Sequence, residues 1–426
     1  MVTPATLSVA QVAKLQFVQE LDLNIDFRNL NYVADMPPGG NQPDGEPVPY
    51  FYAGPSEDVK AVVEYVTSQR HFAPIASPYP NASWTLNFPG PALECTDMST
   101  GFQDAVRHNI AQSILDNYNS PSSSCTTWGY LAWTGMSDST NTTLPFVKAG
   151  NGTWKLNSPS LFNGTGAGPG PIATKPEQFY LVTMPDAMSI YQTGSHSLME
   201  VCNTLYSPKP TVSDIESIIF RGTPTMIQCQ VQNATYRISF DYTNGVPEIS
   251  ATTSIMHDTA LIPIDWVYGP AFFLESGSKF SLPSCSTLNQ IGGFLEDDYS
   301  CYFNETILSS LSYQAIAEAF FDKMVGTVSG LSDGNTHFYN TSVTNTVFVN
   351  ANELSFLIKP VPGTQGRTAG SLQAALQASN GTLYAGLVNN NNTENNITAP
   401  EPPLIATMQD LFRTSVVSMV SSRRLT

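Results

Sequence analysis

The stretch Tyr-Arg-Ile-Ser-Phe-Asp-Tyr-Thr-Asn-Gly, residues 236–245, decides the fold class. Large apolar side chains alternate with polar ones from Tyr236 to Tyr242, and this period of two predicts a half-buried strand. Asn244-Gly245 follows directly and favours the tight turn of a β-hairpin, because both residues tolerate positive φ. An antiparallel sheet is therefore expected around this segment.

Three other regions carry strand signals. Alternation at 83–88 and an apolar run at 179–184 each predict a strand. Residues 347–349 and 354–358 are expected to form a further pair. Runs of strands with scattered helices indicate an α+β fold with a mainly antiparallel β-sheet.

About four amphipathic helices are expected. One starts after Ser56, which caps it, and a second starts near Thr100, where Gln103 completes a capping box. The others cover about 313–325 and 406–420. In the last one Thr407 is the expected cap with Asp410 three residues on, and its apolar stripe needs a partner inside or outside the domain.

Two segments rich in Gly, Pro or Asn interrupt this pattern, at 151–177 and 389–403. The first predicts a boundary between an N-terminal α+β lobe (1–150) and a C-terminal β-rich lobe with a terminal helix (178–426), with 151–177 as a linker. The second is expected to be a loop before the last helix.

The charge balance limits the functions available to the chain. The 426 residues include 18 Lys+Arg and 35 Asp+Glu, a net charge of −17, without basic blocks, which excludes nucleic-acid binding through a positive field.

No run of 18 apolar residues predicts a membrane span, and residues 1–19 lack the pattern of a signal peptide. Since the rest has the character of an exported protein, targeting and anchoring segments are expected outside these residues.

The cysteine count is even, and no two cysteines form a C-x-x-C pair, which argues against zinc and redox sites. Six cysteines allow 15 pairings, of which we favour neighbours: Cys95 with Cys125, Cys202 with Cys229, and Cys285 with Cys301. The alternative is six buried free thiols in a cytosolic protein.

Acceptor sequences for N-glycosylation also indicate export, since N-x-[ST] occurs ten times. These predicted sites are Asn81, Asn141, Asn151, Asn163, Asn233, Asn304, Asn340, Asn380, Asn391 and Asn396.

Four segments carry a resemblance to a known family: Pro-Ala-Thr-Leu-Ser-Val at 4–9, Phe-Pro-Gly-Pro-Ala-Leu-Glu-Cys at 88–95, Gln-Cys-Gln-Val-Gln-Asn-Ala-Thr-Tyr at 228–236 with its Asn-Gly turn, and Gln-Asp-Leu-Phe at 409–412. The chain resembles, along most of its length, the large extracellular region of uncharacterised multi-spanning membrane proteins of filamentous (ascomycete) fungi. The resemblance implies topology and compartment, with membrane spans outside this chain, and no activity.

Signals for catalysis are weak. Gly330-Leu331-Ser332-Asp333-Gly334 matches G-x-S-x-G but lacks the strand before and the helix after that a nucleophile elbow needs, so a plain loop is expected. The five histidines form no metal pair, and the acidic run 296–298 is expected to be a solvated loop rather than a calcium site. Trp128, Tyr130 and Trp133 are expected to be buried against a Cys95–Cys125 bridge, the alternative being exposed rings that stack on sugars. No catalytic residue, metal or cofactor is assigned.

The leading hypothesis is a non-enzymatic ectodomain at the fungal cell surface, or secreted, that binds or senses a cell-wall glycan or protein ligand. The alternatives are a secreted glycan-directed hydrolase and a structural spacer between membrane helices. A pocket with two carboxylates, or a Ser–His pair in hydrogen-bond reach, would favour the hydrolase.

Overall fold

The structure is a computed structural model of the whole chain. It describes residues 18–20, 30–34, 50–77, 79–118, 126–136, 144–148, 152, 154–156, 174–185, 210–220, 224–256, 294–297, 300–303, 305–331, 336–339, 341–357 and 403–419. None of the helices in this part of the chain combines the length and the apolar character that crossing a bilayer requires.

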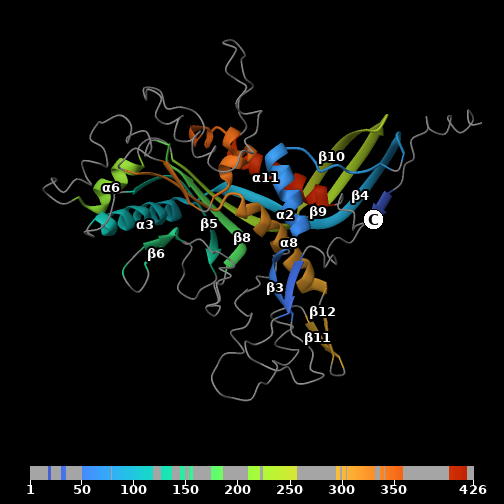
Figure 1. The fold of residues 1–426 in the computed structure, drawn as a ribbon, viewed down its shortest axis with the longest axis horizontal. Coiled ribbons are helices and arrows are strands. Elements are labelled where there is room, and N and C mark those ends of the chain that lie inside the picture. Colours follow the sequence, from blue (N-terminus) through green and yellow to red (C-terminus); the bar gives the residue numbers. More distant parts are fainter. Residues whose placement is uncertain are drawn as a thin grey trace, which may run out of the picture.

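One eight-stranded, mainly antiparallel sheet organises the molecule (Figure 1). Its strand order is β1-β4-β9-β8-β5-β13-β14, with β10 paired to β9. The bounds are β1 Val18–Glu20, β4 Ala82–Asp97, β5 Thr126–Met136, β8 Thr174–Thr183, β9 Thr225–Thr243, β10 Val246–Ile255, β13 Gly326–Leu331 and β14 Thr336–Tyr339.

The long strands β4 and β9 form the longest strand pair of this sheet. They pair antiparallel from Ala82 opposite Tyr242 to Asp97 opposite Ile227. On the other side of β9, β8 pairs with residues 225–230 and β10 with residues 234–243. The sheet therefore divides along β9 into an arm with β8, β5, β13 and β14 and an arm that ends at β10.

The hairpin predicted at Asn244-Gly245 is confirmed. Asn244 has φ 53° and Gly245 has φ 79°, the left-handed values that a two-residue hairpin turn needs. Thr243 and Val246 flank the turn directly as a cross-strand pair. The predicted alternation is also confirmed, since Tyr236, Ile238 and Phe240 are completely buried.

Strands from both sides of the linker predicted at 151–177 enter the same sheet. β4 and β5 come from residues 1–150, whereas β9 and β13 come from residues 178–426. The predicted boundary thus does not separate two sheets. Three two-stranded pairs stand apart from the main sheet: β2 (Leu30–Ala34) with β3 (Tyr50–Pro55), β6 (Phe146–Lys148) with β7 (Trp154–Leu156), and β11 (Phe294–Asp297) with β12 (Ser300–Phe303).

Helices pack on the sheet in two separate cores. The larger core joins the sheet to α2 (Glu57–Gln69), α8 (Glu305–Asp322) and α11 (Leu404–Ser418). The smaller core joins the β5–β8 arm to α3 (Thr100–Tyr118) and α6 (Val212–Ile219). Figure 1 shows α3 and α6 at one end of the molecule and α2, α8 and α11 near its middle.

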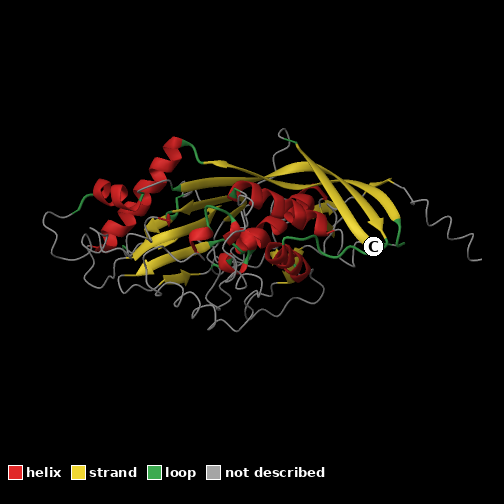
Figure 2. Cartoon of the chain, turned by 90° about the horizontal axis from the view of Figure 1, so that it is seen from above, coloured by secondary structure: helices red, strands yellow, loops and turns green. Residues whose placement is uncertain are grey.

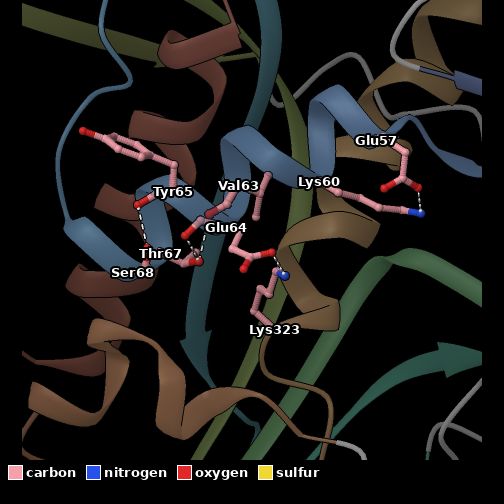
Figure 3. A network of polar contacts seen from close by, with 8 residues as sticks. All are labelled: Glu57, Lys60, Val63, Glu64, Tyr65, Thr67, Ser68 and Lys323. Atoms are coloured by element: carbon pink, nitrogen blue, oxygen red, sulfur yellow. Dashed lines mark hydrogen bonds and ion pairs between the residues drawn. The ribbon is translucent and has the colours of Figure 1, made fainter. Parts of the chain in front are cut away.

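Helix α2 follows the expectation closely. The Ser56 hydroxyl accepts a hydrogen bond from the Val59 N–H, and the valine stripe at 59, 63 and 66 is buried. Figure 3 shows its polar side, where Lys323, just after α8, donates to Glu64 at 3.2 Å and Lys60 to Glu57 at 2.8 Å. The Glu64–Lys323 pair joins the two helices at their surface.

Helix α3 begins at Thr100, but the expected capping box does not form. The Gln103 side chain instead donates to the carbonyl oxygen of Met98 at 2.8 Å. Further along, Asn109 receives the Phe146 N–H at 2.9 Å and donates to its carbonyl at 3.0 Å. The Asn109 amide therefore bonds to the backbone of Phe146 as a neighbouring strand would, and it attaches β6 to α3.

Helix α8 is longer than predicted and begins at Glu305 rather than near Tyr313. Every residue from 313 to 321 is buried, so the helix has no solvated face there. Such a helix lies inside the fold rather than on its surface. The predicted range thus includes the part that is buried on all sides, whereas residues 305–312 were missed.

Two predictions for the C-terminal part are wrong. In place of the predicted pair of strands, the chain forms the 3-10 helices η6 (Val347–Asn350) and η7 (Ser355–Leu357), next to η5 (Val343–Asn345). The Thr346 hydroxyl accepts from the Phe348 N–H, which starts a turn in place of a strand. Helix α11 begins at Leu404, so Thr407 lies inside it and donates to the carbonyl of Pro403 instead of capping.

Candidate binding surface

The outer side of β4, β9 and β10 forms a regular polar surface. The inner side packs on α2 and α11, whereas Figure 2 shows helices on only one side of this part of the sheet. Arg237 and Ser239 are exposed, and Thr85 and Asn87 are half-buried. We call this surface the polar face, and it consists of Ser83, Thr85, Asn87, Thr235, Arg237, Ser239, Asp241, Glu248, Ser250, Thr252 and Ser254.

The register of the three strands arranges these side chains in rows. Thr85, Ser239 and Ser250 lie side by side across the strands. The next row contains Asn87, Arg237 and Thr252. Neighbours in a row are about 4.8 Å apart and successive rows about 7 Å apart, because every second residue of a strand points to the same side. The polar face is thus a regular array of hydrogen-bonding groups.

Most of these groups are neutral hydroxyls and amides, which both donate and accept hydrogen bonds. Arg237 is the single cation of the polar face, and the acids Asp241 and Glu248 lie together at its turn end. The Thr252 hydroxyl donates to the carbonyl oxygen of Arg237 at 3.3 Å. An array of this kind suits a ligand with many hydroxyl groups better than a charged polymer.

The disulfide corrects two of the three predicted cysteine pairings. Cys95 of β4 forms a disulfide with Cys229 of β9, not with Cys125, and the pairing of Cys202 with Cys229 is wrong for the same reason. The two strands place Cys95 directly opposite Cys229, with Cα atoms 4.0 Å apart, although 134 positions separate them in sequence. Cys125, Cys202 and Cys285 lie outside the described residues, so the pairing of Cys285 with Cys301, which is in β12, stays a prediction.

The aromatic cluster near residue 130 is buried, with Tyr130 and Trp133 inaccessible and Trp128 8% exposed. Its expected contact with a Cys95–Cys125 bridge does not exist. Trp128 and Tyr130 also do not share a side of the sheet, since Trp128 packs in the smaller core and Tyr130 in the larger. A register shift against β13 at Val328/Ser329 leaves Gly129 as an extra residue, which reverses the alternation.

Two predicted glycosylation sites lie in the described residues. Asn81 is half-buried just before β4, and its Oδ1 accepts the Asn244 N–H at 2.8 Å at the end of the hairpin. Asn233 lies inside β9, between the stretches paired with β8 and β10, and is also half-buried. The remaining sites lie outside the described residues: Asn141, Asn151, Asn163, Asn304, Asn340, Asn380, Asn391 and Asn396.

The geometry that a hydrolase would need is not found in the described part of the chain. Strands β13 and β14 place Ser329 opposite His337, but the buried Ser329 hydroxyl has no hydrogen-bond partner. His108 contacts Glu216 at 3.2 Å on the surface. No three His, Cys, Asp or Glu side chains of the described residues are grouped to hold a metal ion. Ser332, His196 and His257 lie outside the described residues.

The acidic run and the G-x-S-x-G motif both fall at hairpins. Glu296 and Asp297 end β11, which pairs with β12, so the loop predicted at 296–298 is wrong for these two residues. Gly330 and Leu331 end β13. The next strand after the motif begins at Thr336. A strand thus does precede the motif, but a second strand and not a helix follows it, which a nucleophile elbow does not permit.

Comparison with protein-family models, with curated protein sequences and with solved structures finds no match to this chain.

Proposed function

We propose that this chain is the extracellular region of a fungal cell-surface membrane protein, without enzymatic activity, and that its polar face binds a neutral cell-wall glycan. The observation that carries the proposal is the array of hydroxyl and amide groups on the side of β4, β9 and β10 that no described helix covers. A polysaccharide chain offers hydroxyl groups at repeating distances, so several rows of the array would engage one ligand.

The disulfide supports an extracellular location. Structural disulfides form and persist in oxidising environments and are rare in the cytosol. Cys95 and Cys229 are 6% and 3% exposed, which identifies their bond as part of the folded core and not a surface oxidation product. The sequons and the resemblance to fungal membrane proteins agree with this compartment.

The charge of the chain favours a neutral ligand over an anionic one. With a net charge of −17, the protein repels anionic polymers at long range, and one arginine on the polar face does not offset this. Binding is therefore expected to depend on hydrogen bonds and to change little with ionic strength.

The test is cosedimentation with insoluble β-glucan, chitin and mannan. We expect the protein to bind at least one of them and the triple variant Thr85→Val, Ser239→Ala, Ser250→Ala to lose most binding, since it removes one complete row of hydroxyls. A control with the same chemistry, Thr96→Val with Ser99→Ala, alters two exposed hydroxyls at the opposite end of β4, one inside the strand and one just after it. Binding that survives the triple variant, or no binding to any of the three, would contradict the proposal.

The extracellular location of the chain is tested in a separate experiment. Expression of the whole gene with a tag, followed by surface biotinylation and endoglycosidase treatment, should label the protein and lower its apparent mass. A protein that stays unlabelled in intact cells and insensitive to the endoglycosidase would overturn the extracellular assignment.

A further inference from the structure

The outer edge of β10 is a regular strand edge with no described strand beside it. β10 pairs with β9 over its whole length, from Val246 to Ile255, without a register shift. Val246 is 68% exposed, and Figure 1 shows the strand at the margin of the sheet. Its side chains contain only one ionisable group, Glu248.

The hairpin turn determines which backbone groups this edge presents. Thr243 and Val246 flank a two-residue turn, so they form a hydrogen-bonded pair, and every second residue after Val246 bonds to β9. The N–H and C=O groups of residues 249, 251, 253 and 255 therefore point away from the sheet. Pro247 presents only its carbonyl.

Natural sheets usually protect such an edge with lysines, bulges, inward charges or short strands. β10 has ten residues, no lysine or arginine and no bulge. Its one proline is the second residue of the strand, where it removes a single donor. An edge of this length and regularity offers a template on which another strand can pair.

We propose that the edge receives β10 of a second copy of this chain, antiparallel, about a twofold axis at Ala251. In this register Glu248 lies opposite Ser254 of the other copy, and Ser250 lies opposite Thr252. The two glutamates are about 20 Å apart, given about 3.4 Å for each residue of a strand. A parallel pairing in register would place them together, so the charge pattern favours the antiparallel pair.

The backbone complementarity is nearly complete in this arrangement. Residues 249, 251 and 253 each exchange two hydrogen bonds with the other copy, and Ile255 donates to the Pro247 carbonyl, about eight bonds in total. Thr–Ser pairs across neighbouring strands add a smaller stabilisation. The net charge of −17 opposes association, so the dimer is expected to strengthen as salt screens that repulsion.

The first test uses sedimentation of the intact protein. We expect the wild type to dimerise and the variant Ser250→Glu, Thr252→Glu to be monomeric, because each new glutamate faces another across the axis. A control with the same added charge, Ala61→Glu with Thr96→Glu, changes exposed residues away from β10 and should still dimerise. Mixing the glutamate variant with Ser250→Lys, Thr252→Lys should restore association as a mixed dimer.

The second test is crosslinking. Ala251→Cys places two cysteines opposite each other at the axis, and mild oxidation should yield a covalent dimer. Val246→Cys, although more exposed, lies near the strand end and should crosslink far less. A wild type that is monomeric at high protein and salt concentration, or a glutamate variant that dimerises as the wild type does, would overturn the proposal. Equal crosslinking at the two positions would also overturn it.

Discussion

The hydroxyl of Tyr130 in β5 donates a hydrogen bond to the backbone carbonyl oxygen of Met324, 2.6 Å away in the turn after α8. Both residues are completely buried, and burial raises the pKa of the Tyr130 hydroxyl well above its ordinary value, so it stays a donor. The Thr341 hydroxyl also reaches this carbonyl, at 3.3 Å. One oxygen atom thus joins β5, the end of α8 and the segment before η5.

Replacing this tyrosine should destabilise the fold by a modest, measurable amount. We expect Tyr130→Phe to lower the free energy of unfolding by about 1–2 kcal/mol, because the buried carbonyl loses one of its two donors. Urea denaturation followed by tryptophan fluorescence measures the change. Tyr65→Phe, at a tyrosine that is 38% exposed on α2, is the control and should change little. Equal effects of the two variants would show that the contact with Met324 contributes nothing.

The Cys95–Cys229 bond should be the largest single covalent contribution to stability among the described residues. Loop entropy for a sequence separation of 134 amounts to about 5 kcal/mol. We expect Cys95→Ala with Cys229→Ala to lose up to that amount in chemical denaturation. Peptide mapping without reduction should recover the two cysteines in one linked species, and a Cys95–Cys125 peptide would refute the bond.

The packing of helix α11 against the rest of the fold should depend on the side chain of Phe412. This side chain is completely buried and meets Phe320 of α8 edge to face, with ring centres 5.2 Å apart. Phe412→Ala is expected to cost about 3–5 kcal/mol, through lost burial and the cavity left behind. Arg413→Ala, on the surface of the same helix, is the control.

Deletion of residues 404–426 should lower the melting temperature, and an unchanged melting temperature would mean that the helix serves a partner outside this fold.

Asp116 should make the docking of β6 and β7 on α3 depend on pH. Partial burial acts to raise the pKa of its carboxyl group, but hydrogen bonds from Lys148, Trp154 and Gln112 and the charge of Lys148 together lower it below the ordinary value. The ionised group therefore stabilises the fold above its unfolded-state pKa, and this contribution is lost as the pH falls through the folded-state pKa.

The measurement compares wild type with Asp116→Asn from neutral to acid pH. The difference in unfolding free energy between them is expected to be constant near neutrality and to shrink below about pH 4, where the unfolded-state carboxyl begins to take up protons. Asp104→Asn removes an exposed acid from the same helix without altering these contacts. A difference that persists unchanged at the acid end would exclude the carboxylate as its source.

Three local signals predicted the local structure correctly. The Ser56 cap, the valine stripe of α2 and the Asn244-Gly245 turn each depend on residues within one or two turns of chain, and all are confirmed. Helix α8 was only partly predicted, since residues 313–322 lie in the predicted range and residues 305–312 were missed. At Thr346 a single side-chain contact favoured 3-10 turns over the strand that the valines predicted.

Long-range pairing was not accessible from the sequence. Nothing near Cys95 identifies Cys229 as its neighbour, since the register of β4 against β9 creates that contact. The polar face has the same origin. The alternation at 236–242 identified the polar residues that β9 contributes to the polar face. The residues that lie beside them on β4 are more than a hundred positions away in the sequence.

The bond between Cys95 and Cys229 also has a consequence for the order of folding. A slip of one residue between β4 and β9 would turn the two side chains to opposite sides of the sheet, so oxidation is possible only in the native register or one close to it. Contacts between segments so distant in sequence form slowly, because a long loop must close before any contact forms. Once formed, the bond keeps the correctly aligned pair together while α8 and α11, which come later in the chain, pack against it.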